Sequence, residues 1–257
     1  MFIVREKPPS FADVAGHVLR SVVAIAIGTT ETGSPNIVGT GFACAASEFF
    51  ATCWHVAEIQ DSLDALDSGA LRDRGLVDST LRLGIRTEDG SHVWSQMQPK
   101  TMFRGADRAQ DVCIYRMVGV SIPPLQLRPD DRWLMGQDVG IIGFPLGNAL
   151  QGSSVRPFVA KTVLAGGFET ETNDGEIPRV AIATAVAGGF SGAPIFSAVD
   201  GEVLGMVASK VMEVEESQWP AGISLGVVPS IIHQSFRELF GRTSTIIKES
   251  LQKTLPD

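Results

Sequence analysis

The sequence predicts an all-β protein built from two six-stranded antiparallel β-barrels, with short N-terminal and C-terminal helices. Three observations support this prediction. Twelve short apolar runs are separated by Gly, Pro, Asn and Asp, which is typical of barrels and sandwiches. Long segments of helical periodicity are missing from the middle of the chain, so βαβ units are not indicated. A joint rich in Pro, Gly and Asp at 119–136 divides the runs six and six.

The predicted strands are short and follow one another closely. In chain order they cover 21–28, 39–45, 48–56, 79–87, 92–97, 111–118, 138–144, 156–165, 179–186, 193–199, 202–209 and 222–228. Helical patterns occur at three places. The helix at 11–20 leads into the first strand, and 57–73 has an apolar stripe at helical spacing on an acidic background. The helix at 229–242 begins with Pro and ends at Gly.

These elements divide the chain into five segments. We expect a helical lead-in at 1–20, a first barrel at 21–120, a linker at 121–136, a second barrel at 137–228, and a C-terminal helix and tail at 229–257. A chain of 257 residues is long enough to give both barrels a substantial core.

Composition excludes several classes of function. Lys and Arg number 21 against 29 Asp and Glu, a net charge of −8, whereas a general nucleic-acid binder needs clustered positive charge. No apolar segment of signal-peptide type follows the N-terminus, and the longest apolar run near it, 22–28, is too short to span a bilayer. We therefore expect a cytoplasmic protein that binds neither nucleic acid nor membrane.

The cysteine and histidine spacing indicates no metal site. Three cysteines are too few, and of the wrong parity, for a disulfide framework, so free thiols are expected; a bridge between Cys44 and Cys53 across a hairpin is the alternative. The chain has no His-x-x-x-His motif and no phosphate loop of the Walker type. We therefore expect no metal and no cofactor.

One stretch, AVAGGFSGAPIF (185–196), carries a candidate nucleophile, Ser191. A serine between glycines is by itself typical of a turn. It becomes a nucleophile only with a base and a third group that orients the base. His55 follows a strongly apolar strand, and Asp111 stands at the head of another, where a carboxylate is a strand-start cap or the partner of an imidazole. The candidate order is His55, Asp111, Ser191.

At these residues the chain resembles a known family. GTGFACAASEFFATCWHV (39–56) resembles the segment that carries the histidine in trypsin-like serine peptidases of the chymotrypsin fold, in the HtrA-like bacterial branch without a PDZ domain. Four more segments are similar to parts of the family's domain. DVCIYRMV (111–118) is similar to its aspartate strand, and VGIIGFPLG (139–147) to the strand that opens its second barrel. GGFSGAPIFSAVDGEVLGMVAS (188–209) is similar to its nucleophile loop with the following hairpin, and GISLGVVPSII (222–232) to its closing strand and the start of the helix after it.

The resemblance implies a serine endopeptidase that cleaves protein or peptide substrates through an acyl-enzyme. In the family the histidine takes the serine proton and passes it to the leaving amine, while the aspartate orients the imidazole. These roles fall to His55, Ser191 and Asp111. The resemblance also implies an oxyanion hole made by the N–H groups of Gly189 and Ser191.

The chain departs from the family pattern at three places. Phe190 stands where the family often has Asp or Asn, and Ala193 stands where it most often has Gly. The stretch 57–80 is long and acidic for the connection after the histidine, so we expect it to be a regulatory or docking insertion.

Specificity follows from the resemblance alone. Ala185 stands six residues before the serine, where an acid would select Arg or Lys, so a trypsin-type preference is not expected. The resemblance places Ala208, Ser209 and Lys210 on the edge strand that pairs with substrate, and Ser224 near the pocket wall. A small or medium apolar residue at the cleavage site is the expectation. Lys210 leaves an acidic residue open, although a solvated lysine at a loop edge is the preferred interpretation.

Three other functions remain as alternatives. An α/β-hydrolase needs a helix after the serine, whereas a strand and a turn follow Ser191. A catalytically silent module on the same fold would bind peptides along a sheet edge. A latent peptidase would await an activating or regulatory protein partner, with mobile loops at 147–155, 169–178 and 210–221.

Overall fold

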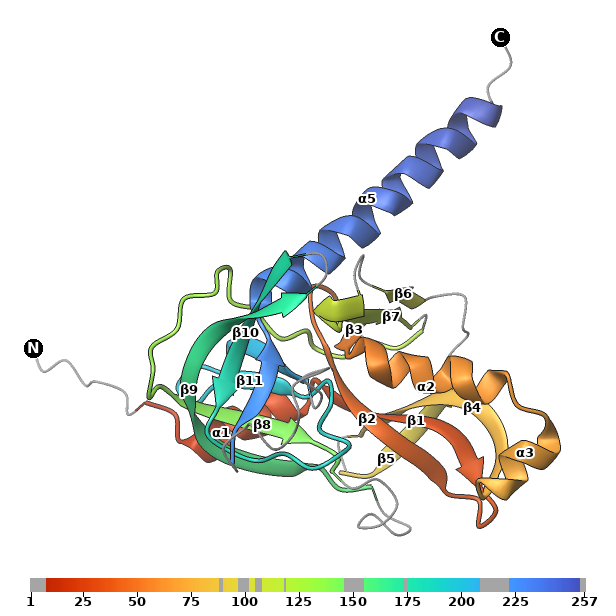
Figure 1. Ribbon diagram of the computed structural model, residues 1–257, viewed down its shortest axis with the longest axis horizontal. Helices are drawn as coiled ribbons and strands as arrows, with labels where there is room; N and C mark the ends of the chain where they lie inside the picture. The colour runs from red at the N-terminus through yellow and green to blue at the C-terminus, as the bar shows by residue number, and fades with distance from the viewer. Residues whose placement is uncertain are drawn as a thin grey trace, which may run out of the picture.

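The structure is a computed structural model of the chain. It describes residues 8–87, 90–96, 102–104, 108–117, 119–145, 155–172, 175–208 and 222–254. Two antiparallel β-structures lie side by side, with three short helices against them and one long helix that projects from the body (Figure 1). The predicted all-β class is confirmed.

The N-terminal half forms one antiparallel sheet. Its described strands are β1 (Val22–Thr30), β2 (Pro35–Ala43), β3 (Phe49–Thr52), β4 (Leu76–Arg86), β5 (His92–Gln96), β6 (Met102–Arg104) and β7 (Cys113–Arg116), in the spatial order β5-β4-β1-β2-β3-β7-β6. The sheet has one strand more than we predicted, because the short β6 pairs with β7 at the edge. A three-residue strand carries too little alternation for the sequence pattern to indicate it.

The C-terminal half forms a closed six-stranded barrel. Its strands are β8 (Asp138–Gly143), β9 (Phe158–Thr172), β10 (Gly175–Ile182), β11 (Pro194–Ser197), β12 (Val203–Ala208) and β13 (Ser224–Val227), closed in the order β10-β13-β12-β11-β8-β9. The prediction of a loop at 169–178 is wrong, since β9 and β10 pair through this stretch. Exposed Glu side chains made a solvent-facing hairpin resemble a loop. The predicted loop 210–221 and nearly all of 147–155 lie outside the described residues.

The segment around His55 is helical rather than extended. We predicted a strand at 48–56 and one helix at 57–73, but β3 ends at Thr52 and α2 (Trp54–Asp64) begins two residues later. Extended Cys53 is the N-cap of α2, so His55 lies in the first turn of the helix. The side chain of Asp67 caps a separate helix, α3 (Ser68–Asp73), which splits the predicted one.

The N-terminal helix packs on the half of the molecule that is remote from it in sequence. Helix α1 (Phe11–Leu19) begins with a capping box between Ser10 and Asp13. It precedes β1, yet it contacts β8 of the barrel, where its Phe11 ring stacks on Phe196.

The C-terminal helix contacts the sheet as well as the barrel that it follows. Helix α5 (Pro229–Thr254) follows the barrel strand β13 and extends beyond the predicted end at residue 242. Its Phe236 and Phe240 rings contact Phe49 on β3 of the sheet. Helix α5 also contacts β12 of the barrel, so it lies against both halves, whereas α1 lies against the half that is remote from it in sequence.

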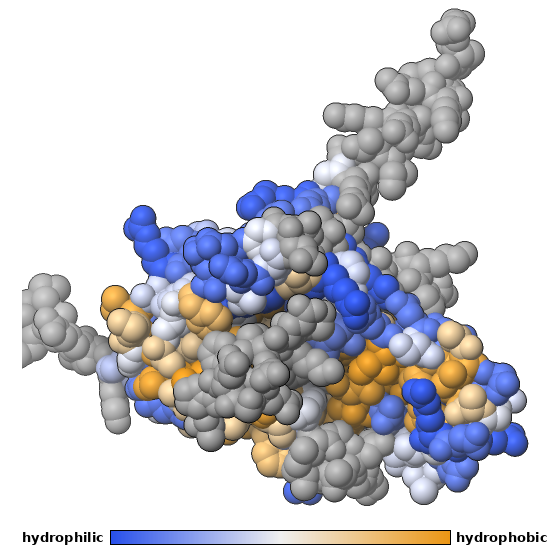
Figure 2. Space-filling view, in the orientation of Figure 1, coloured by the Kyte–Doolittle hydropathy of each residue, from blue (hydrophilic) through white to orange (hydrophobic). Residues whose placement is uncertain are grey.

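The connection at 121–136 lies along both halves. Leu125 forms a parallel bridge with Cys44 of the sheet half, and Leu127 forms one with Val203 of the barrel. Buried side chains from both halves form one continuous core. On the face shown in Figure 2, hydrophilic side chains surround the β9–β10 hairpin, and apolar ones show over the β1–β2 strands. Among the described residues, no helix is both long and apolar enough to cross a membrane.

Candidate active site

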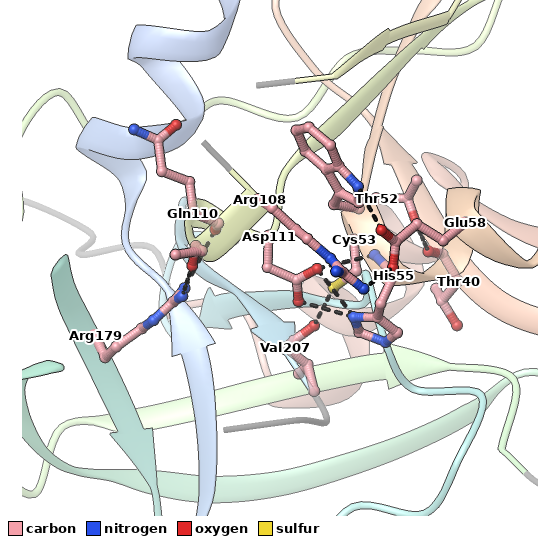
Figure 3. Close-up of polar contacts among 12 residues, drawn as sticks. Thr40, Thr52, Cys53, His55, Glu58, Arg108, Gln110, Asp111, Arg179 and Val207 are labelled. Carbon is pink, nitrogen blue, oxygen red and sulfur yellow. Dashed lines mark hydrogen bonds and ion pairs between the residues drawn. The ribbon is translucent and has the colours of Figure 1, made fainter. Parts of the chain in front are cut away.

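His55 and Asp111 meet as predicted. The His55 Nδ1 atom lies 3.0 Å from Oδ1 and 2.9 Å from Oδ2 of Asp111, and the backbone N–H of His55 donates to Oδ1 at 3.0 Å (Figure 3). The two side chains are 22% and 13% exposed, so water screens the pair only in part. The carboxylate thereby fixes the ring orientation and selects the tautomer with Nδ1–H, which leaves Nε2 to act as a base.

Asp111 lies in a strained turn. We predicted that it begins a strand, but β7 begins two residues later, at Cys113. Asp111 directly follows a short 3₁₀ helix, η2 (Arg108–Gln110), and its backbone has φ of +56°. Asp tolerates this left-handed conformation better than most residues do. Buried Val112 then leads into β7.

Ser191 lies in a tight turn against β2 of the sheet half, the half that also carries His55. The residue is 3% exposed, and its carbonyl oxygen accepts a hydrogen bond from the N–H of Thr40 at 2.9 Å. Gly39 lies between the two segments, since a Cβ there would be 2.8 Å from Val56 and 3.3 Å from the Ser191 oxygen. The structure thus brings the serine loop to the start of α2.

Gly189 before Ser191 and Gly192 after it cannot be replaced by a residue with a side chain without a backbone shift. Gly189 has φ of +96°, and a Cβ on it would lie 2.3 Å from the carbonyl oxygen of Phe144. Gly192 has φ of +87°, and a Cβ on it would lie 2.0 Å from the carbonyl oxygen of Thr40. Both the conformation and the space exclude a side chain at these positions.

The N–H of Gly189 is available to a ligand. Within the described part of the chain this group has no acceptor, whereas the Gly189 carbonyl accepts from the Thr40 hydroxyl. An unpartnered backbone donor beside a serine is the property that an oxyanion hole requires.

Thr40, on β2, organises the serine loop through all its polar atoms. Its Oγ1 donates to the Gly189 carbonyl at 2.7 Å and accepts from the Phe144 N–H at 3.1 Å. Its own carbonyl accepts from the Thr52 hydroxyl at 2.7 Å. Thr40 is fully buried, so each of these hydrogen bonds is costly to lose.

The Val207 carbonyl links the serine loop to the segment before His55. The Val207 oxygen accepts from the N–H of Gly192 at 2.8 Å and from the thiol of Cys53 at 3.1 Å (Figure 3). Burial raises the pKa of the Cys53 thiol, and the negative charge of Asp111 beside it raises that pKa further. The thiol therefore stays protonated and keeps its role as a donor. All three cysteines are free, as predicted.

The Cys53, His55 and Asp111 side chains also form a set of metal-ligand type. Their Sγ, ring nitrogen and carboxylate oxygen atoms lie within 4.8 Å of one another. The thiol and the imidazole nitrogen are both engaged in the hydrogen bonds described above.

The two departures within the serine loop are accommodated by packing. Phe190 is buried, and its ring lies over Gly143 of β8, where a Cβ would come within 2.6 Å of it. Apolar contact with β8 thus anchors the serine loop at this position. Ala193 is buried and does not have a positive φ, so its methyl group causes no backbone strain.

The residues predicted to select substrate are described only in part. Ala185 is exposed on the chain leading to the serine loop. Ser224 accepts a hydrogen bond from the N–H of Val186 at 3.0 Å, so its hydroxyl supports this segment. Ala208 is buried and pairs with Leu225. The predicted residues Ser209 and Lys210 lie outside the described residues.

Sequence reasoning missed two residues at the site. Thr40 lies in an apolar strand, where a hydroxyl is a signal for a buried hydrogen bond. Arg179 lies in the apolar segment of β10, where a charged side chain is a comparable signal.

The comparisons with known proteins identify the family and the fold. Residues 39–206, more than half of the chain, match the family model described as a trypsin-like peptidase domain, and the chain therefore belongs to the trypsin-like peptidases. No curated protein sequence matches the chain. The predicted membership of this family is confirmed.

Solved structures of HtrA-type proteases share the fold. A variant of the HtrA-type protease AlgW with a tripeptide is 14% identical, with a TM-score of 0.63, and the match covers 90% of this chain and 64% of that one. AlgW with a tripeptide is 15% identical, with a TM-score of 0.59 and coverage of 87% and 61%. The present chain thus spans less than two thirds of the length of these AlgW chains.

A third structure matches over almost its whole length. An inactive form of Rv3671c from M. tuberculosis is 16% identical, with a TM-score of 0.61 and coverage of 93% and 98%. At these identities the likeness concerns the fold, which is chymotrypsin-like as predicted.

Proposed function

We propose that this chain is a serine endopeptidase that hydrolyses peptide bonds through an acyl-enzyme on Ser191. The observation that carries the proposal is the His55 imidazole held by both oxygens of the Asp111 carboxylate, at 2.9 and 3.0 Å. A pair of this geometry, on a trypsin-like fold with a serine turn beside it, is suited to activating a hydroxyl.

Each step uses groups of this chain. His55 Nε2 takes the proton from the Ser191 hydroxyl as the oxygen attacks the substrate carbonyl, and Asp111 stabilises the imidazolium that forms. The N–H groups of Gly189 and Ser191 stabilise the oxyanion, where loss of one donor costs about 3–4 kcal/mol. The imidazolium then protonates the leaving amine, and water activated by the same imidazole releases the acid.

The substrate is a protein or peptide without a basic residue at the cleavage position. Support comes from Ala185, which offers no charge six residues before Ser191. A small or medium apolar side chain suits that position best. The AlgW structures are of that protease with a tripeptide, which is consistent with a peptide substrate here.

An activating partner is also proposed, with α2 and α3 as its docking region. These helices occupy most of the acidic stretch 57–80, and they pack on β4, where the Gln60 side chain donates to the carbonyl of Ser79 at 2.7 Å. The outer faces of the helices are exposed and acidic. A partner bound there would lie next to His55, which is in the first turn of α2.

A fluorophosphonate probe tests the proposed function. Such a probe reacts with a serine only when a base and an oxyanion hole are in place. We expect wild-type protein to be labelled and the Ser191→Ala protein, which should keep its circular dichroism spectrum and melting temperature, to be unlabelled.

Two results would reject this assignment. Equal labelling of the Ser191→Ala protein would mean that another residue reacts. A wild-type protein that binds peptides but is never labelled, with or without partners captured on α2 and α3, would identify a silent peptide-binding module.

A further inference from the structure

Arg179 joins the barrel to the segment that carries Asp111. It lies on β10, and its guanidinium donates to the carbonyl oxygen of Gln110 at 3.3 Å and, through its other terminal nitrogen, to that of Ala109 (Figure 3). Ser191 belongs to the half that carries Arg179, whereas Asp111 belongs to the other half. The contact therefore crosses between the two parts of the site.

The two carbonyl groups lie at the C-terminal end of η2. Ala109 and Gln110 are the last residues of η2, and the final carbonyls of a helical turn lack partners within the turn. A guanidinium near this end satisfies them and complements their partial negative charge. Its planar fork lets one side chain hold two neighbouring oxygens in a fixed orientation.

This hydrogen bond controls the backbone of Asp111 directly. The Gln110 carbonyl belongs to the same planar peptide group as the N–H of Asp111, so fixing its oxygen fixes the plane from which Asp111 departs. Asp111 has φ of +56°, a conformation that persists only where the surroundings enforce it. Without the guanidinium, the residue would relax toward negative φ and move its carboxylate away from His55.

A second contact on the same turn is weaker. Arg108 forms an ion pair with Glu58 of α2 at 2.8 Å, but its side chain is 60% exposed. Pairs of this kind contribute little because water competes for both partners. Arg179 is half-buried, and its backbone pairs with both neighbouring strands, at Phe168 on β9 and Val227 on β13. It is therefore the firmer of the two supports.

We infer that Arg179 is a positioning residue that holds the Asp111 turn in its active conformation from the opposite half of the molecule. The inference rests on the proposed function, since it concerns the same proton-transfer pair. The hydrogen bonds of Arg179 would couple the two halves, because any change that moves β10 relative to the sheet would also move the Asp111 carboxylate that orients His55.

Three variants test the inference. Arg179→Met keeps the aliphatic stem and removes the donors, and Arg179→Lys keeps the charge but loses the fork. Arg82→Met is the matched control, because Arg82 is also a partly buried arginine that bonds a carboxylate and a carbonyl, those of Asp78 and Thr80, away from the site.

The first readout is steady-state kinetics on a peptide substrate over a range of pH. We expect Arg179→Met to lower kcat by about 10²-fold, the scale for misplacement of a catalytic group by about 1 Å, with little change in KM. The acidic limb of its pH–rate profile should move, because the pairing of His55 with Asp111 is altered. Arg179→Lys should lose less kcat, and Arg82→Met should lose stability but keep the kcat and the profile of the wild type.

The second readout needs no activity. In the Ser191→Ala protein, the His55 Nδ1 proton should give a resolved low-field NMR resonance, which Arg179→Met should broaden or abolish and Arg82→Met should leave in place. If the wild type hydrolyses nothing, the proposed function fails while this resonance still decides the role of Arg179. An Arg179→Met protein with the kcat and the resonance of Arg82→Met overturns the inference. If Arg179→Met does not fold, full kcat and an unchanged resonance in Arg179→Lys overturn it equally.

Discussion

At the scale of single residues, the structure supports the proposed triad of His55, Asp111 and Ser191 with buried hydrogen bonds to the neighbouring backbone. Thr40, Val207 and Arg179 hold the peptide groups next to Gly189, Gly192 and Asp111. Preorganised backbone donors stabilise developing charge without reorganisation at the moment of reaction. Such supporting residues should therefore affect turnover more than substrate binding.

Thr40 gives a test of this expectation. Thr40→Val keeps the shape but removes the hydroxyl that donates to the Gly189 carbonyl and accepts from the Phe144 N–H. We expect kcat to fall by about 10-fold or more, toward the loss that follows removal of an oxyanion donor, because the Gly189 peptide is no longer held. Steady-state kinetics at a temperature where the variant is folded measures this.

Thr40→Ser is the matched control for that experiment. It keeps the hydroxyl and loses only a methyl group, so most of kcat should be retained. Equal kcat in the Val and Ser variants would show that the hydroxyl does not organise the oxyanion hole.

At the scale of elements, the sequence predicted strands well where alternation or apolar runs were clear. It failed where a local cap decided the outcome. Extended Cys53 ends the strand before His55 and starts α2, and the Asp67 side chain starts α3; neither event changes the apolar pattern. The His55–Asp111 pairing could be predicted from the order of the family's motifs along the chain. The hydrogen bond from Arg179 to the Gln110 carbonyl could not, because it depends on how two segments distant in sequence pack together.

Strand β4 carries an ion pair with a distinct pH signature. Burial alone would raise the pKa of the Asp78 carboxyl, but hydrogen bonds from Arg82, from Thr80 and from Thr29 outweigh it and lower that pKa to about 2. The ordinary value in an unfolded chain is about 3.9. The unfolded state therefore binds the proton more tightly, and the pair stabilises the fold above about pH 4 and ceases to do so as pH falls through about 2.

Asp78→Asn measures that contribution. We expect a lower melting temperature than that of the wild type at pH 7, with a difference that shrinks as pH falls from about 4 to about 2. Thermal unfolding followed by circular dichroism at several pH values provides the comparison. A difference independent of pH would mean that the carboxylate charge does not contribute.

At the scale of the whole molecule, the terminal helices fasten the two halves to each other. Helix α1 lies against the barrel although it precedes the sheet, and α5 contacts β12 of the barrel as well as β3 and β7 of the sheet (Figure 1). Because His55 and Asp111 belong to one half and Ser191 to the other, we expect these helix contacts to contribute to the alignment of the site.

Phe236 tests whether α5 makes the halves one cooperative unit. Its ring is 4% exposed and meets Phe49 of β3 edge to face, with centroids 6.1 Å apart. Phe236→Ala should lower the free energy of unfolding by about 3–5 kcal/mol, the range for truncating a buried phenylalanine. The matched control is Phe240→Ala on the same helix, which is 46% exposed and should cost about 1 kcal/mol.

The way in which stability is lost matters as much as its amount. If the core shared by the two halves makes them a single unit, urea unfolding of Phe236→Ala stays one transition, and hydrogen exchange followed by mass spectrometry shows the strands of the sheet and of the barrel losing protection together. Loss of protection confined to β3 and β7, with the barrel strands unchanged, would show that the halves unfold independently. Alignment of Ser191 with His55 would then depend on local contacts such as those of Thr40 and Arg179, and not on the terminal helices α1 and α5.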